Sequence, residues 1–189
     1  MFKRARFVGE AEQMSKDITA LKPFCDKDTL NVVIETPQGS RGKYRYNEKS
    51  GLFELSKIMP AGMEFPYDFG FIPGTRGEDG DPLDVLVFLD IIVPTGCLLR
   101  CRPIGVIEAE QTDKNKKPVR NDRLVAVPIE HHGNSHSDVK SLKEISAELL
   151  KELEQFFINY NSIRNVKFKL LGCRGPKTAL KLVAKSSKK

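Results

Sequence analysis

The sequence has no tryptophan, and aromatic residues make up only 8% of its 189 positions. These aromatic residues are not interleaved with the basic ones, as a surface that stacks nucleic-acid bases would require. No run approaches the roughly 20 apolar residues that cross a bilayer, and the charged start of the chain does not resemble a secretory leader. We therefore expect a cytoplasmic protein that binds neither nucleic acid nor membrane.

Cysteine and histidine are also scarce. The four cysteines are Cys25, Cys97, Cys101 and Cys173. At this chain length they favour free thiols over a disulfide framework, and no second Cys or His pair follows at zinc-finger spacing. The three histidines are His131, His132 and His136. Because no cysteine lies near them in the sequence, we interpret this cluster as a surface loop and not as a metal site.

Charge is plentiful by contrast, since 31 basic residues exceed 25 acidic ones and give a net charge of +6. A basic surface attracts anions of every kind, including small phosphates. Part of the excess lies in residues 185–189, which we interpret as a basic tail. Residues 1–28 are polar and predict an N-terminal extension with a short helix near residues 10–20. One domain would span residues 29–184.

From Leu30 onward the sequence is typical of short strands separated by glycine and proline. Residues 30–35 form an apolar run that Pro37 and Gly39 end. Residues 42–46 and 52–57 flank a polar segment and predict a hairpin. Further apolar runs, again bounded by turn residues, lie at 85–93, 97–107 and 124–129. Many short strands of this kind favour a small antiparallel β-barrel.

Helical patterns come late in the chain. Residues 141–144, Ser-Leu-Lys-Glu, have the form of a capping box. The residues beyond keep the spacing of one apolar helix face: Ile145, Leu149, Leu150, Leu153, Phe156, Phe157 and Tyr160. We expect this stripe to lie in the core. A strand at 166–171 follows, and Gly175-Pro176 begins a second helix. The predicted class is α+β or mainly β, with helices beside the barrel.

Three carboxylates, those of Asp79, Asp81 and Asp84, lie within six residues, directly before an apolar strand. Gly80 and Pro82 force a turn, so we expect the carboxylates to meet at the mouth of the barrel. Like charges this close repel one another, and a divalent cation is the usual reason that such an arrangement persists. Oxygen-only ligands select Mg²⁺, with Mn²⁺ and Ca²⁺ as substitutes. The competing interpretation is an acidic turn in solvent without a metal.

Two other ligand-binding motifs do not fit the sequence. An EF-hand requires a ligand where Leu83 stands and a glycine where Asp84 stands. Residues 39–44 lack both the glycine spacing of a nucleotide-binding P-loop and its Ser or Thr after the lysine.

Residues 79–85 resemble the signature of the family I soluble inorganic pyrophosphatases. Other segments resemble the family in the same order along the chain: 33–37, 42–44, 65–73, 101–106 and 124–128, followed by Phe156, Phe157 and Tyr160. The resemblance runs from about Leu30 to the end of the second helix. The chain length is similar to that of the shorter, bacterial-type members, which form hexamers.

The resemblance implies Mg²⁺-dependent hydrolysis of inorganic pyrophosphate to two phosphates by a metal-activated water, with Mn²⁺ as a substitute. It also implies a five-stranded, OB-like antiparallel barrel with two C-terminal helices, and a homo-oligomer, with a hexamer favoured. Asp81 would be the general base. The metal ligands would be Asp79, Asp81, Asp84 and Glu35. The residues that bind phosphate would be Lys43, Lys57, Arg123 and Tyr160.

The sequence departs from the family pattern where phosphate or metal would bind. The replaced positions are Arg45 (usually an acid), Lys57 (usually an arginine), Arg123 (usually a lysine), Phe65 and Phe69 (usually tyrosines) and Asn161 (usually a lysine). The family also has two aspartates before the strand at 124–128, and counting back without gaps puts Asn121 and Gln111 there. If the alignment with the family is shifted by one residue, Asp122 takes one of the two aspartate positions, and Asp113 or Glu110 could serve as the other ligand. We favour Asp122 as a metal ligand, because losing both aspartates would leave the metals short of ligands.

These departures leave two alternatives to an active pyrophosphatase. A related hydrolase would cleave a different phosphoanhydride or prefer a different metal. A non-catalytic relative would bind phosphate or metal and use the barrel for assembly. The retained acids, Lys43 and Tyr160 favour the active enzyme.

Overall fold

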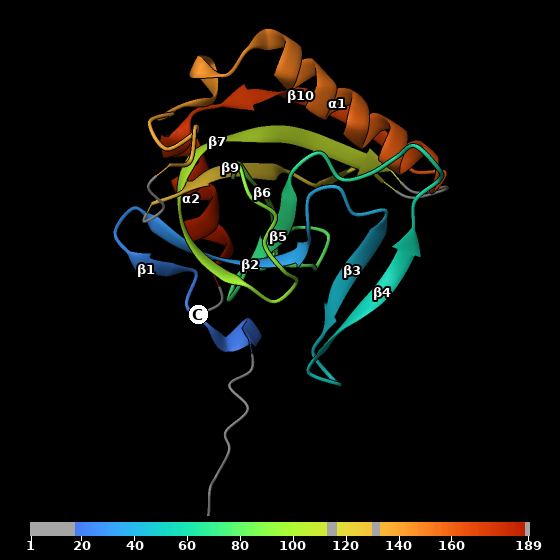
Figure 1. The fold of residues 1–189 in the computed structure, drawn as a ribbon, viewed down its shortest axis with the longest axis horizontal. Helices are drawn as coiled ribbons and strands as arrows, with labels where there is room; N and C mark the ends of the chain where they lie inside the picture. The colour runs from blue at the N-terminus through green and yellow to red at the C-terminus, as the bar shows by residue number, and fades with distance from the viewer. Residues whose placement is uncertain (1–17, 113–116, 130–132, 188–189) are drawn as a thin grey trace, which may run out of the picture.

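Five strands close into a barrel in the computed structural model, which describes residues 18–112, 117–129 and 133–187. In order around the ring they are β2 (Thr29–Thr36), β5 (Asp68–Ile72), β6 (Leu83–Val87), β9 (Arg123–Pro128) and β7 (Leu98–Thr112). The start of β7 pairs back with β2 and closes the ring. The five-stranded, OB-like barrel predicted from the sequence is therefore confirmed (Figure 1).

The prediction that the barrel is antiparallel throughout is wrong at one pair of strands. β6 and β9 run parallel, with Asp84 beside Arg123 and Val87 beside Ala126. Parallel neighbours need a long crossover connection, and here β7 provides it by carrying the chain back across the barrel. The parallel register matters for the site because it sets an aspartate of the acidic turn directly beside an arginine.

Three further strands extend this sheet at its edges. β1 (Phe24–Asp26) pairs with β2, whereas β8 (Val119–Arg120) and β10 (Lys167–Arg174) pair with β7. The predicted hairpin is also present. Its strands, β3 (Gly42–Asn47) and β4 (Leu52–Ile58), form a separate two-stranded sheet that stands beside the barrel (Figure 1).

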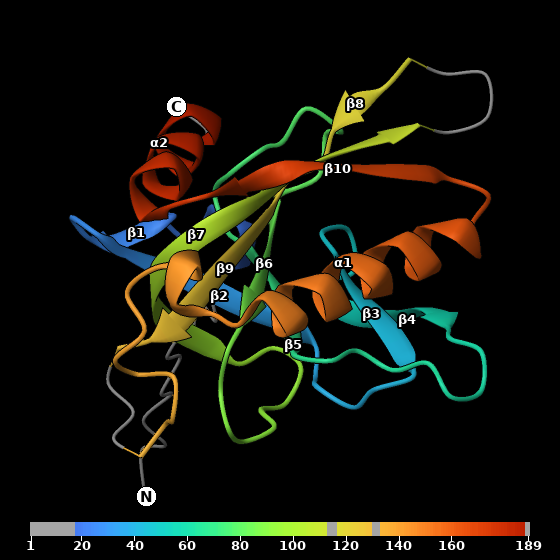
Figure 2. The same ribbon diagram turned by 90° about the horizontal axis from the view of Figure 1, so that it is seen from above.

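Both helices predicted near the C-terminus are present. They are α1 (Ala147–Ser162), which packs against β10, and α2 (Pro176–Ser186), which packs against β7; they lie at different parts of the barrel surface (Figure 2). α2 begins with Pro at its first position, as predicted. No helix in the described ranges is long and apolar enough to span a membrane.

The predicted start of the first helix at the capping box is wrong. Ser141 caps only a short 3-10 turn, η2 (Leu142–Glu144), and Ile145 then takes an extended conformation. α1 begins after Ser146, whose Oγ accepts a hydrogen bond from the backbone N–H of Leu149 at 3.2 Å. The extended backbone at Ile145 separates the two turns, so the capping pattern at Ser141 does not lead into α1.

The core has two parts because strand side chains alternate between faces. On β6 and just beyond it, Val85 and Val87 pack into a cluster with α2, whereas Leu86 and Phe88 pack into a second cluster with α1. The predicted apolar stripe of α1 lies in the second cluster, as expected. This packing fixes Tyr160, on the last turns of α1, next to the barrel.

The ends of the described chain are part of the fold. Of the helix predicted near residues 10–20, only a 3-10 turn, η1 (Ile18–Ala20), falls within the described residues. At the other end α2 includes Lys185, and Ser187 forms an isolated β-bridge with Thr75. Residues 185–187, predicted as part of a basic tail, therefore lie against the barrel.

The remaining cysteine and histidine predictions are tested only in part. All four cysteines are free, as predicted, and Cys101 is buried. His131 and His132 lie outside the described residues. His136 is partly buried beside the rings of Tyr67 and Phe88, and its Nε2 is 4.0 Å from Oδ1 of Asp90.

Candidate active site

A cavity of about 800 Å³ lies between the β3–β4 hairpin, the mouth of the barrel and α1. Eight of the nine site residues predicted from the sequence line it. They are Glu35, Lys43, Lys57, Asp79, Asp81, Asp84, Arg123 and Tyr160. These residues come from six secondary-structure elements and one turn, so the fold gathers them from segments more than 100 residues apart in the chain.

The hairpin side of the cavity contains a buried acid and a partly buried lysine. Glu35, at the end of β2, is 8% exposed, and its Oε1 accepts a hydrogen bond from the backbone N–H of Tyr46 at 3.0 Å. Its Oε2 lies 4.0 Å from Nζ of Lys43. Burial raises the pKa of Glu35 and lowers the pKa of Lys43, while their mutual attraction opposes both shifts.

Lys43 also contacts aromatic rings of the cavity wall. Its Nζ lies 4.1 Å from the ring centre of Phe69 and 5.8 Å from that of Phe65. Cation–π contact of this kind holds a lysine in place without giving it an acceptor. The two phenylalanines therefore position Lys43, and its N–H groups remain able to bind an oxygen ligand. Lys57, opposite Lys43 in the hairpin, has its pKa lowered by burial and by the charges of Arg164 and Lys43.

The acidic turn has the shape predicted from Gly80 and Pro82. Gly80 has φ = +90°, a conformation that favours glycine. The backbone N–H of Asp81 donates to Oδ1 of Asp79 at 3.2 Å. Asp79 as a whole is exposed to solvent. The surrounding protein nevertheless removes part of the water from its carboxylate, which raises the pKa of Asp79, and the negative charge of Asp84 raises it further. The turn therefore concentrates negative charge at the cavity wall.

Two arginines pair with the other carboxylates of the turn. Nη2 of Arg45 lies 2.6 Å from Oδ1 of Asp81, and both side chains are mostly exposed, at 61% and 55%. Nη1 of Arg123 lies 3.0 Å from Oδ2 of Asp84, and these side chains are 5% and 22% exposed. Solvent screens the first pair, so it contributes little free energy. The second pair is largely shielded from water and interacts more strongly.

Arg123 is the most enclosed cation of the cavity. Its Nη1 donates to the backbone carbonyl and to the side-chain Oδ1 of Asn121, and its guanidinium lies 5.4 Å from the ring centre of Phe157. Its buried Nε has no hydrogen-bond partner among the described residues. A buried donor without a partner is costly, so this one favours a ligand with acceptor oxygens.

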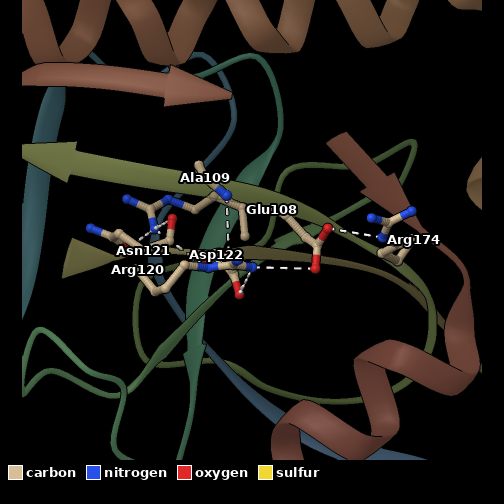
Figure 3. Close-up of polar contacts among 7 residues, drawn as sticks. Glu108, Ala109, Arg120, Asn121, Asp122 and Arg174 are labelled. Carbon is tan, nitrogen blue, oxygen red and sulfur yellow. Dashed lines mark hydrogen bonds and ion pairs between the residues drawn. The ribbon is translucent and has the colours of Figure 1, made fainter. Parts of the chain in front are cut away.

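The prediction that Asp122 faces the cavity is wrong, because Asn121 lines it instead. Asp122 lies beside a neighbouring cavity of about 470 Å³. Its Oδ1 accepts from the backbone N–H of Ala109 at 3.0 Å and from Arg120, whose Nη2 bonds both of its oxygens at 2.8 and 2.9 Å. Figure 3 shows this network continuing through Glu108. Arg120 thus holds Asp122 outside the candidate site.

The other replaced positions have clear placements. Gln111 lines the cavity and Glu110 does not, while Asp113 lies outside the described residues. Asn161 is fully buried within α1, where its Nδ2 donates to the carbonyl of Phe157 at 2.8 Å. It therefore acts in helix packing and does not line the cavity.

Sequence reasoning missed Arg164, which lines the cavity just beyond α1. Its guanidinium lies 5.9 Å from the ring centre of Tyr160. The spacing of four residues from Tyr160 places both side chains on one side of the helix end, and this spacing was the available signal. Arg76 and Lys49 also line the cavity without having been predicted.

The carboxylates of the cavity suit a hard cation in their chemistry. All are oxygen donors, and the repulsion between Asp79 and Asp84 is one that a divalent cation would relieve. In their present positions no three acidic, His or Cys side chains of the described residues lie close enough together to hold a metal. Asp81 and Asp84 contact arginines, so both carboxylates would have to leave these arginines before they could bind a metal.

Comparison with known proteins gives one consistent result. A model of the family described as inorganic pyrophosphatase matches residues 32–189. The chain is 34% identical over 160 residues to the inorganic pyrophosphatase of Thermoplasma volcanium, covering 84% of this chain and 92% of the relative. It is 32% identical over 154 residues to that of Synechocystis, covering 82% and 87%.

Solved structures agree with the sequence comparisons. The chain is similar to the inorganic pyrophosphatase of Thermus thermophilus, with a TM-score of 0.80, 26% identity and coverage of 90% of this chain and 96% of that one. It is similar to the inorganic pyrophosphatase of Coxiella burnetii, with a TM-score of 0.78, 32% identity and coverage of 88% and 97%. The chain therefore belongs to the inorganic pyrophosphatase family.

Proposed function

We propose that this chain hydrolyses inorganic pyrophosphate to two phosphates in the cavity beside the acidic turn. The observation that carries the proposal is the meeting of that turn with Lys43, Lys57 and Arg123 in one cavity. Acids that suit metal ions and cations that suit phosphate oxygens are what phosphoryl transfer to water requires. Membership of the inorganic pyrophosphatase family supports the same activity.

The cationic side chains would bind the substrate. Arg123 offers a guanidinium with a buried, unpartnered Nε among the described residues, and a guanidinium bonds phosphate oxygens in pairs. Lys43 and Lys57 approach from the hairpin, opposite the acidic turn. Tyr160 would donate its hydroxyl to a phosphate oxygen, and burial keeps that hydroxyl protonated by raising its pKa.

Asp79, Asp81, Asp84 and Glu35 would hold Mg²⁺, with Mn²⁺ as a substitute. Bound metal would neutralise charge on pyrophosphate and make the attacking water more acidic. Asp81 is the proposed general base, which takes a proton from that water. Its exposed position at the cavity edge gives water access to its carboxylate.

A second candidate function is metal or phosphate binding without catalysis. Its support is the pairing of Asp81 and Asp84 with arginines, together with an amide at Asn121 where the family has an acid. Weaker metal binding would slow or abolish hydrolysis. Changed phosphate contacts at Phe65 and Phe69 would instead favour a hydrolase that acts on a different phosphoanhydride.

Phosphate release from pyrophosphate, ATP and tripolyphosphate, with Mg²⁺ or Mn²⁺ varied, separates these functions. We expect release from pyrophosphate that depends on the metal, and slower release from the other two substrates. Release from ATP or tripolyphosphate alone would favour the changed substrate. No release from any substrate at any metal concentration would leave only the non-catalytic function.

We further propose a cytoplasmic homo-oligomer, with a hexamer favoured. Free cysteines are typical of a reducing compartment. Large apolar side chains are exposed on the hairpin and on the loop after β6; they are Leu52, Leu55, Ile58, Ile91 and Ile92. Exposed apolar groups favour burial against another subunit. Sedimentation of the purified chain would measure its oligomeric state.

A further inference from the structure

The two arginine–carboxylate pairs of the cavity carry an inference about how metal and substrate bind. We infer that Arg45 and Arg123 serve as built-in counter-ions of Asp81 and Asp84, so that a divalent cation binds the free chain weakly and binds tightly only together with pyrophosphate. The inference rests on the proposed function, because it concerns the same cavity. It assigns a role in metal and substrate coupling to Arg45, which lies on the hairpin and faces the turn.

The first step of the argument is charge. Among the described residues, seven basic and six acidic side chains line the cavity. The acids are therefore balanced by the chain itself before any metal arrives. A divalent cation that enters alone meets Asp81 and Asp84 already paired, and it is repelled by the arginines beside them.

The second step is geometry. Arg45 and Asp81 belong to segments 36 residues apart, and their 2.6 Å contact joins the hairpin to the acidic turn. Arg123 reaches Asp84 across the parallel pair of strands at 3.0 Å. In both pairs a carboxylate oxygen that would bind a metal contacts a guanidinium nitrogen instead. No group of three metal-binding side chains is formed in the described residues while these pairs are in place.

The third step is the preference of each partner. A guanidinium binds phosphate oxygens through paired charge-assisted hydrogen bonds, and carboxylates bind Mg²⁺ or Mn²⁺. When pyrophosphate and metal enter together, the arginines turn to the phosphates and the carboxylates turn to the metal. Each ligand then favours binding of the other, which is positive coupling between them.

Arg45 is the side chain on which to test this, because it is exposed and its loss should not disturb the core. Arg174 provides a matched control. Its Nε lies 2.9 Å from Oε2 of Glu108, and its side chain is 60% exposed against 61% for Arg45. Arg174 does not line the cavity. Removing either arginine changes the net charge equally. A difference in Mn²⁺ affinity between the two variants is therefore due to the place of Arg45 in the cavity.

The experiment measures Mn²⁺ binding by electron paramagnetic resonance, with and without methylenediphosphonate, a non-hydrolysable analogue of pyrophosphate. We expect the analogue to tighten Mn²⁺ binding to the wild-type chain at least tenfold, after correction for Mn²⁺ bound by the analogue in solution. For the free chain, Arg45→Gln should bind Mn²⁺ about two to five times more tightly than wild type, the range for an exposed ion pair. Arg174→Gln should bind it as wild type does.

Equal Mn²⁺ affinities of wild type and Arg45→Gln would overturn the inference, and so would a wild-type affinity that the analogue leaves unchanged while both ligands bind. Failure of the analogue to bind at all, with or without Mn²⁺, would instead overturn the proposed function. Thermal melting of both variants shows that the fold is intact. The two failures are therefore distinguishable without any activity measurement.

Discussion

Two groups of carboxylates and arginines lie next to each other in this protein, and they differ in what surrounds them. The cavity group contains Asp79, Asp81 and Asp84 with Arg45 and Arg123. The Glu108 group contains Glu108 and Asp122 with Arg120 and Arg174. In the Glu108 group every carboxylate bonds an arginine, and Asp122 also accepts from a backbone N–H. In the cavity group, Asp79 contacts no arginine within ion-pair distance among the described residues, and its pKa is raised.

The difference shows that arginine pairing alone does not identify a functional site. Satisfied partners and a fixed geometry are typical of a network that stabilises the fold. A raised pKa at Asp79 and a buried donor on Arg123 that has no partner among the described residues are instead typical of a site that binds a ligand. The two groups should therefore respond to substitution in opposite ways.

The largest expected effect is on catalysis, at Asp81. Asp81→Asn should lower kcat for pyrophosphate by about 10²- to 10⁴-fold, because general-base catalysis contributes about that much. Its side chain is 55% exposed, so thermal melting should change little. Steady-state phosphate release and a melting curve measure the two quantities. Asp138→Asn, an exposed aspartate that does not line the cavity, is the control and should retain full activity.

An unchanged kcat for Asp81→Asn would place the general base elsewhere. A loss of activity that accompanied a large loss of stability would show that the acidic turn belongs with the structural network, and the contrast between the two groups would fail.

The opposite effect is expected at Asp122. Asp122→Ala should lower the free energy of unfolding by about 1–3 kcal/mol, the usual cost of leaving buried hydrogen-bonding groups without partners. The groups that lose a partner are the backbone N–H of Ala109 and the guanidinium of Arg120. Denaturant unfolding measures this change. Mn²⁺ affinity should stay the same, and a weakened affinity would return Asp122 to the metal site.

Much of the fold could be predicted because strand and turn patterns are local. The hairpin β3–β4, α2 and the turn at Gly80 follow from residues within a few positions of each other. The parallel pairing of β6 with β9 could not be predicted in this way, since it depends on the path of the whole connection between them. The prediction of where α1 begins was wrong for a local reason, because the backbone at Ile145 is extended.

In the site, the sequence could not determine which of two neighbouring polar residues faces the cavity. Successive side chains of an extended segment point to opposite sides, so a slip of one residue exchanges Asn121 and Asp122. Both placements keep a polar residue on each side. Arg120 decides between them by binding Asp122, and that contact follows from the pairing of β8 with β7.

The smallest expected effect concerns Glu35, a buried acid of the cavity whose Oε2 lies 4.0 Å from Nζ of Lys43. Burial raises the pKa of Glu35 above its ordinary 4.5, so the folded chain takes up this proton at a higher pH than the unfolded chain does. Lowering the pH from the raised pKa to 4.5 should therefore increase the free energy of unfolding of the wild type relative to that of Glu35→Gln. Outside that pH range the difference between the two free energies should be constant. Urea unfolding of both proteins at several pH values, in EDTA, measures it. A difference that shrinks as the pH falls would mean that the contact with Lys43 outweighs burial, and that this pair behaves like the satisfied pairs of the Glu108 group.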